Sequence, residues 1–182
     1  AFRRNTLTGW FKNRSSPTPA DPEAKVVLYP DLYTNYMLVD RGKAAVRTLE
    51  ALGCDVEVPP TPGAGRAPLS QGMIDTATSK AERVTEELTP YVEQGYDVVV
   101  IEPSDLAMFQ EDYERLLDEG EYEALAENSY EIVEYVYGLL VNGADASALR
   151  ASAGDDVAYH SHCQQRTMGL EEYTLAVLDQ LD

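Results

Sequence analysis

The sequence predicts an α/β domain with a Rossmann-like, mostly parallel sheet of about four strands and flanking helices. Short apolar segments that read as strands alternate with segments of helical periodicity. One of them, "DVVVIEP" at 97–103, is apolar almost throughout, which is typical of a central parallel strand covered on both faces. The 182 residues, 44% of them hydrophobic, fit one domain with a single sizeable core.

The first half of the chain supplies two strands and two helices. Residues 1–24 are Ser- and Pro-rich toward their end and lack a period, so we expect a linker or docking segment there and one domain over 25–182. Helical spacing of apolar residues and Gly53 as a C-terminal cap define the first helix. The expected elements are strand 25–30, helix 37–52, strand 54–59 and a helix from about Met73.

The second half continues the alternation. After strand 97–103, Ser104 is a plausible N-cap for the next helix. "DVAYHSH" reads as the fourth strand. The expected elements are helices 105–118, 121–127 and 129–141, strand 156–162 and helix 168–181.

The charge balance is strongly acidic. The chain has 32 Asp and Glu against 14 Lys and Arg, a net charge of −18. The first 16 residues hold four bases and no acid, which leaves a net charge of −22 on the rest. Such repulsion is screened at molar salt, so this surface resembles those of haloarchaeal proteins and predicts a salt-rich cytoplasm. It argues against nucleic-acid binding by the main domain.

Membrane insertion finds little support in the sequence. No apolar run approaches the roughly 18–20 residues of a membrane span. In the N-terminal segment, Phe2, Leu7, Trp10 and Phe11 alternate with four bases. Peripheral membrane contact and docking onto a neighbouring domain are both compatible with that pattern.

The loop "PPTPGAGRAPLSQG" (59–72) raises the question of phosphate binding. The dinucleotide fingerprint requires a third Gly where Pro68 stands, and the Gly-Lys-Ser/Thr of a phosphate loop is absent. A structural turn is the favoured interpretation. A small-anion site remains an alternative, formed by Arg66, the helix start at Gly72 and Arg166.

Two further groups of residues are candidate sites. His160, His162 and Cys163 are metal-ligand types within four residues, although a fourth ligand is not apparent. Asp31, Glu102 and Asp105 fall at the carboxyl ends of expected strands, where α/β sheets place their sites. They suit acid–base work or cation binding, and a plain solvated surface is the alternative.

Four segments in order, "VVLYPDLYTNYMLVDRGKAAVRTLEALGCDVEVPP", "GRAPLSQGMIDTA", "VVVIEPSD" and "YHSHCQQR", resemble a known family. This is the cysteine-rich, heterodisulfide-reductase-like C-terminal region of FAD-linked oxidases of the D-lactate and glycolate dehydrogenase type. The resemblance implies an electron-transfer domain that holds a 4Fe–4S cluster, with FAD on a separate flavin-containing domain or subunit as its partner. It also implies a 2-hydroxy acid as the substrate of the parent oxidoreductase.

The chain departs from this family at the cluster ligands. Gly63 and Ala64 stand where the family has a Cys-Cys-Gly motif, and Asp105 and Leu32 replace two further cysteines. Cys163 alone of the family's ligands is retained. The family also continues beyond the position of Asp182, which implies a fragment or a shortened copy.

These departures shape the functional expectation. One thiolate cannot hold an iron–sulfur cluster. We therefore expect a structural or docking role for this domain within the oxidoreductase, and no catalysis by the chain alone. A residual metal or redox site around His160, His162 and Cys163 is the alternative.

Overall fold

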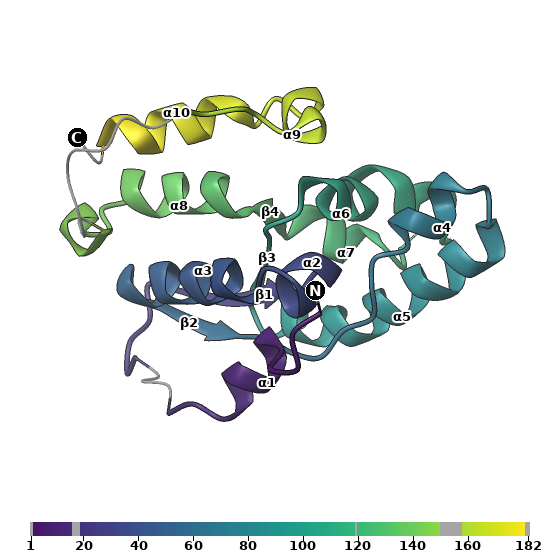
Figure 1. Ribbon diagram of the computed structural model, residues 1–182, viewed down its shortest axis with the longest axis horizontal. Coiled ribbons are helices and arrows are strands. Elements are labelled where there is room, and N and C mark those ends of the chain that lie inside the picture. Colours follow the sequence, from purple (N-terminus) through teal and green to yellow (C-terminus); the bar gives the residue numbers. More distant parts are fainter. Residues whose placement is uncertain (1, 16–18, 119, 150–157, 181–182) are drawn as a thin grey trace.

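A four-stranded sheet with strand order β2–β1–β3–β4 forms the centre of the molecule (Figure 1), and all its pairs are parallel. The computed structural model describes residues 2–15, 19–118, 120–149 and 158–180. Val26 pairs with both Val56 and Asp97, and Val98 pairs with Ser129. The predicted fold class is confirmed. The strands are β1 Ala24–Tyr29, β2 Cys54–Glu57, β3 Asp97–Val100 and β4 Ser129–Glu131.

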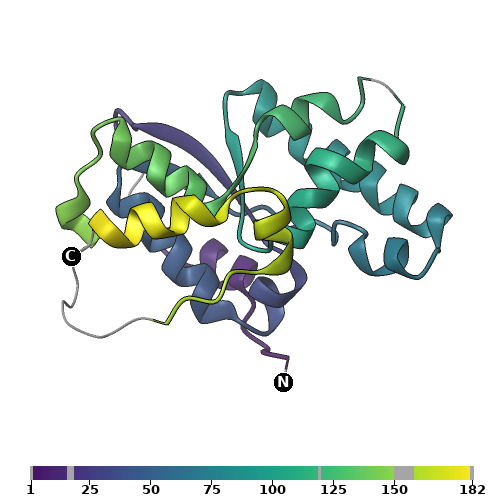
Figure 2. The ribbon, with the colours of Figure 1, turned by 90° about the horizontal axis from the view of Figure 1, so that it is seen from above.

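Helices cover both faces of this sheet (Figures 1 and 2). The short elements around the cavity described below are α2 Leu32–Tyr36, α4 Arg66–Ser70, α6 Pro103–Ala107 and α9 Cys163–Thr167. The remaining helices are α1 Leu7–Lys12, α3 Val39–Ala51, α5 Ile74–Glu93, α7 Glu123–Glu127, α8 Ile132–Val141 and α10 Glu171–Gln180. A π-helical turn is η1 Met108–Asp112, and two 3-10 helical turns are η2 Tyr113–Arg115 and η3 Ala146–Leu149.

Alternation along the strands divides the core into two layers. Val27 and Tyr29 pack with Val84 and Leu88 of α5, whereas Val26 and Leu28 pack on the other face against α3. This period of two is what a strand covered on both faces requires. Leu52 and residues of α8 and α10 form a third, smaller cluster, and α10 lies alongside α8 in both views.

The N-terminal segment packs on this same domain. Leu7 of α1 is fully buried against α3. The Thr8 amide donates to Asn35 Oδ1 at 3.1 Å, and Arg14 pairs with Glu50 at 2.5 Å. None of the helices in the described part of the chain is long and apolar enough to cross a membrane.

Two predicted elements were wrong. The fourth strand is β4 at 129–131, inside the expected helix 129–141, which begins instead at Ile132. The expected strand 156–162 is an irregular segment over 158–162, and its first two residues lie outside the described part. The N-cap of α6 is Glu102 rather than Ser104. Ser104 is a donor instead: its amide and its hydroxyl both bond Glu102 Oε1.

Candidate functional site

A cavity of about 670 Å³ opens at the carboxyl ends of β1, β2 and β3. Parallel α/β sheets gather their sites at this edge, because the loops that leave the strands meet there. Its size lies within the range of about 300–1,000 Å³ that is typical of ligand pockets. Its walls come from Leu32, Tyr33, Leu38, residues 63–68, Lys80, Glu102, Ser104, Asp105 and His162.

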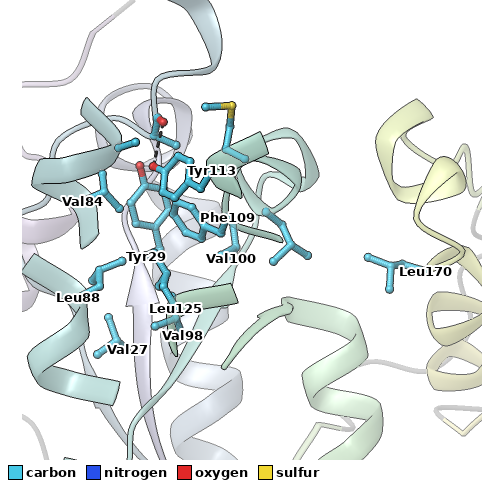
Figure 3. Close-up of a cluster of buried hydrophobic side chains, with 14 residues drawn as sticks. Val27, Tyr29, Val84, Leu88, Val98, Val100, Phe109, Tyr113, Leu125 and Leu170 are labelled. Carbon is cyan, nitrogen blue, oxygen red and sulfur yellow. Dashed lines mark hydrogen bonds between the residues drawn. The ribbon is translucent and has the colours of Figure 1, made fainter. Parts of the chain in front are cut away.

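The loop after β2 is held in shape by the core. The Tyr113 hydroxyl donates to the Ala64 carbonyl at 2.9 Å (Figure 3), and the Tyr29 hydroxyl donates to the Pro62 carbonyl at 3.0 Å. Gly65 has a φ of +96°, and a Cβ there would lie 3.2 Å from the Ala77 carbonyl oxygen. The chain therefore needs glycine at this turn for conformational and steric reasons. A Cβ at Gly63, by contrast, would meet no atom within 4 Å.

Asp31 is a buried carboxylate next to this cavity. Its Oδ1 caps α2 by accepting from the amides of Tyr33 and Thr34, both at 2.9 Å. Its Oδ2 is buried and has no hydrogen-bond partner among the described residues. Burial raises the pKa of Asp31, the hydrogen bonds from Thr34 and Tyr33 act against that rise, and the charge of Glu102 adds to it.

Asp105 is the most strongly perturbed carboxyl group of the cavity wall. Burial raises its pKa from 3.8 to about 7, with contributions from the charges of Asp31 and Glu102, while the Arg66 guanidinium lowers it. The carboxyl group therefore changes charge near neutral pH. Such a group can donate or accept a proton, or bind a polar ligand in either state.

His162 joins the cavity from the C-terminal part of the chain. Its Nε2 lies 3.6 Å from Glu102 Oε1, and its Nδ1 accepts from the Gln164 amide at 3.2 Å as the N-cap of α9. The Glu102 carboxylate lies between His162 and Ser104, whose hydroxyl donates to it at 2.9 Å. The three sequence-predicted carboxylates and His162 thus lie at one edge of the sheet.

The residues expected to bind a small anion are separated. Arg66 lines the cavity and pairs with Asp112 at 2.5 Å. Gly72 is not part of the cavity wall, and Arg166 is exposed and lies 3.7 Å from Glu171. The structure does not assemble the three residues into one site.

The expected metal ligands are also spread out. His162 reaches the cavity, whereas His160 and Cys163 are exposed and do not line it. Within the described ranges, no group of three or more His, Cys, Asp or Glu side chains is arranged to hold a metal ion. A metal at His160, His162 and Cys163 stays a prediction.

The second cysteine is remote from the cavity. Cys54 begins β2, at the opposite edge of the sheet, and is buried. Burial, with the charges of Glu23 and Asp97, raises the pKa of its thiol to about 12. Cys54 is therefore a core residue without thiolate character near neutral pH.

The cavity brings together the positions at which the family resemblance places cluster ligands. Leu32, Gly63, Ala64 and Asp105 all line it. None of the described residues in its wall is a cysteine, so the metal-ligand types in the wall are carboxylates and an imidazole. Iron–sulfur clusters are held by several thiolates. The residues present do not fit a 4Fe–4S cluster.

Sequence reasoning missed Lys80 and the aromatic side of the cavity. Lys80 lies on α5, and its Cβ would be 3.5 Å from a Cβ at Gly65. The sequence signal that could have pointed to Lys80 is the rarity of lysine, because the chain has only four. Tyr33 and Leu38, which follow β1, form the missed side of the cavity wall. Their exposed fractions are 52% and 43%.

Fold and cavity together define an α/β parallel-sheet domain with a cavity at the carboxyl edge. The chain is distantly homologous to Lactate utilization protein A. The protein of that name from Bacillus pumilus (strain SAFR-032) is 30% identical over 160 residues, which cover 85% of this chain and 64% of the relative. Lactate utilization protein A from Geobacillus sp. (strain WCH70) is 24% identical over 161 residues, with the same two shares.

The chain thus spans 64% of the length of these curated relatives. No family model matches the chain, and no solved structure matches it.

Proposed function

We propose that this chain is an electron-transfer-type domain of a lactate-utilization system. The domain has lost its iron–sulfur cluster and now has a structural or docking role. The sequence similarity to two proteins named Lactate utilization protein A supports the assignment to a lactate-utilization system. The parent activity would be oxidation of a 2-hydroxy acid. The partner would be a flavin-containing domain or subunit that carries FAD.

The composition of the cavity carries the proposal. Four positions matched to family cysteines lie around one space, and they hold Leu32, Gly63, Ala64 and Asp105. These positions lie in the segments that follow β1, β2 and β3, and such segments meet at this edge of a parallel sheet. The loss of thiols with retention of the space is what a domain kept for its shape would leave.

Restoring the thiols tests the proposal. We expect the native chain to take up no cluster on anaerobic incubation with iron and sulfide. A variant with Leu32→Cys, Gly63→Cys, Ala64→Cys and Asp105→Cys should gain the broad visible absorbance of a cluster and about four irons per chain. Gly63 has no neighbour that a side chain would meet within 4 Å, and Leu32 is 54% exposed, so neither change strains the fold.

The matched control carries the same number of new thiols away from the cavity. Asp75, Glu93, Glu111 and Glu172 are exposed and serve as the four cysteine positions, with Asp75 and Glu93 near opposite ends of α5. This control should bind iron and sulfide no better than the native chain. A stoichiometric cluster in the native chain would refute the proposal, as would equal uptake by control and restored variants.

The docking role has its own measurement. The exposed apolar residues at the cavity mouth, Leu32, Tyr33 and Leu38, suit a protein contact. We expect the native chain to form a complex with the flavin-containing partner, and a Tyr33→Asp, Leu38→Asp variant to lose that complex. An unchanged complex in this variant would exclude the cavity mouth as the contact.

A further inference from the structure

A second cavity, of about 570 Å³, lies at the opposite, amino-terminal edge of the sheet. Its wall includes Ala24 and Asp97, the first residues of β1 and β3, together with parts of α8 and α10. It shares no residue with the first cavity. The proposed function makes no use of it.

Four tyrosines line this second cavity. The rings of Tyr130 and Tyr135 are 5.6 Å apart between centroids, and those of Tyr137 and Tyr173 are 5.4 Å apart. All four side chains are partly buried. Gly138 also lines the cavity, and a Cβ there would meet nothing within 4 Å. The aromatic wall therefore borders open space.

The charged side chains of this cavity are all acidic. Glu23, Asp97 and Glu134 line it, and none of the described residues in its wall is Lys, Arg or His. The Tyr135 hydroxyl donates to Asp97 Oδ2 at 2.7 Å, which fixes that carboxylate beside the rings. The Glu134 carboxylate accepts from the Glu131 amide at 3.2 Å in the capping box of α8. This hydrogen bond fixes the position of the Glu134 carboxylate.

Aromatic faces and carboxylates attract the same class of ligand. A cation over the face of a tyrosine is drawn by the ring quadrupole, and weakly hydrated ammonium groups gain most because they lose little hydration. Anions are repelled by three carboxylates, and a bare metal ion is far too small for this space and lacks a converging ligand set. A small organic cation matches both the aromatic rings and the acidic side chains of the wall.

We propose that the second cavity, lined by Tyr130, Tyr135, Tyr137, Tyr173 and three carboxylates, binds a small quaternary or tertiary ammonium compound. The tyrosine faces contact the alkylated nitrogen, and Asp97 and Glu134 supply the opposing charge. The two sites lie at opposite edges of the sheet, so this proposal stands whether or not the first cavity ever binds a cluster.

Choline and its uncharged isostere 3,3-dimethylbutan-1-ol separate cation recognition from simple apolar binding. The two have the same shape, and a carbon replaces the charged nitrogen. We expect choline to bind the native chain by calorimetry at least about ten-fold more tightly than the isostere, at constant ionic strength. Equal affinity for both compounds would overturn the proposal, and so would the absence of choline binding.

Variants assign the binding to this cavity. Tyr137→Leu removes one ring of a pair, and Asp97→Asn removes a charge while keeping an oxygen for the Tyr135 hydroxyl. Each should weaken choline binding by about three- to thirty-fold with little change for the isostere. Tyr33→Leu, a tyrosine of the first cavity, is the matched control and should bind as the native chain does. Equal choline binding by all four proteins would place the site elsewhere and overturn the proposal.

Discussion

The Asp105 carboxyl group has the chemistry of a functional site at a position where the family resemblance expects a thiol. It lines the cavity, and the charges of Asp31 and Glu102 and its own burial all favour its neutral form. Arg66, whose charge opposes this effect, is paired with Asp112 at 2.5 Å. The residue therefore destabilises the fold when it is ionised, which is a cost that surface carboxylates do not carry.

Replacing Asp105 by Asn tests this cost. The folded-state pKa, about 7, lies above the ordinary 3.8, so the folded chain binds the extra proton between these pH values. The stabilisation of the fold by this bound proton is complete below pH 3.8 and is lost as the pH rises through 7. Asp105→Asn should raise the free energy of unfolding at pH 8 by about 1–3 kcal/mol and change it little at pH 4.

Urea unfolding at a series of pH values measures this difference. Glu86→Gln on the exposed face of α5 is the control for loss of one negative charge. It should shift stability by less than about 0.5 kcal/mol at any pH. A parallel shift of the Asp105→Asn curve at pH 4 and pH 8 would contradict the assigned titration.

Residue-level reasoning placed two carboxylates of the cavity wall, Glu102 and Asp105, and the neighbouring Asp31. The expected strand ends placed Asp31, Glu102 and Asp105 at one edge because parallel strands share their carboxyl edge. Lys80 escaped that reasoning, since it reaches the cavity from the middle of α5, a long helix that follows the loop rather than a strand end. A contact of that kind depends on helix packing, which no local pattern specifies.

At the scale of elements, the segment 128–141 shows why the fourth strand was misplaced. Its apolar residues recur at helical spacing, and only three residues, Ser129–Glu131, extend β3. Glu131 ends the strand and begins the helix at once, because its side chain accepts from the amides of Val133 and Glu134. A strand this short is defined by its partner, not by its own pattern.

The converse error has the same cause. Residues 158–162 alternate as a strand would, yet β4 occupies the free edge of β3. The side chains of this segment bond locally instead: the Tyr159 hydroxyl donates to Gln165 Oε1 at 2.8 Å. Alternation indicates a strand only where a sheet edge is available.

The docking of α1 on α3 depends on Gly42. A Cβ at this position would lie 2.5 Å from Leu7 Cδ2 and 2.6 Å from Thr34 Cγ2. Gly42→Ala should therefore lower the free energy of unfolding by about 1–3 kcal/mol, although alanine favours a helix by about 1 kcal/mol. Faster tryptic cleavage after Lys12 would accompany the loss as α1 detaches.

Gly138→Ala on α8 is the matched control, because a Cβ there would meet no atom within 4 Å. It should leave stability unchanged or raise it by up to about 1 kcal/mol, with native resistance to trypsin. If both alanine variants behave alike, close packing of α1 at Gly42 does not hold that helix in place.

At the scale of the whole molecule, charge is distributed unevenly along the chain. Residues 1–47 contain eight bases and four acids, whereas residues 48–182 contain six bases and 28 acids. Several basic side chains of the first part surround one ring: Arg14, Lys43 and Arg47 lie 4.9, 5.6 and 5.9 Å from the centroid of Trp10. Cation–π attraction to this ring and the Arg14–Glu50 ion pair join α1 to α3.

The acidic part makes stability depend on salt. Between 0.1 M and 1 M salt the Debye length falls from about 10 Å to about 3 Å, so repulsion among surface carboxylates is largely screened. The melting temperature should rise by several degrees over this range in KCl and level off above it. Sucrose at equal osmolality should not reproduce this early rise, because it leaves charge repulsion unscreened.

A variant with Glu82, Glu86, Glu87 and Glu93 of α5 replaced by Gln should start from a higher melting temperature and respond less to KCl. An equal response of variant and native chain would show that ion exclusion, rather than screening of these carboxylates, sets the salt dependence.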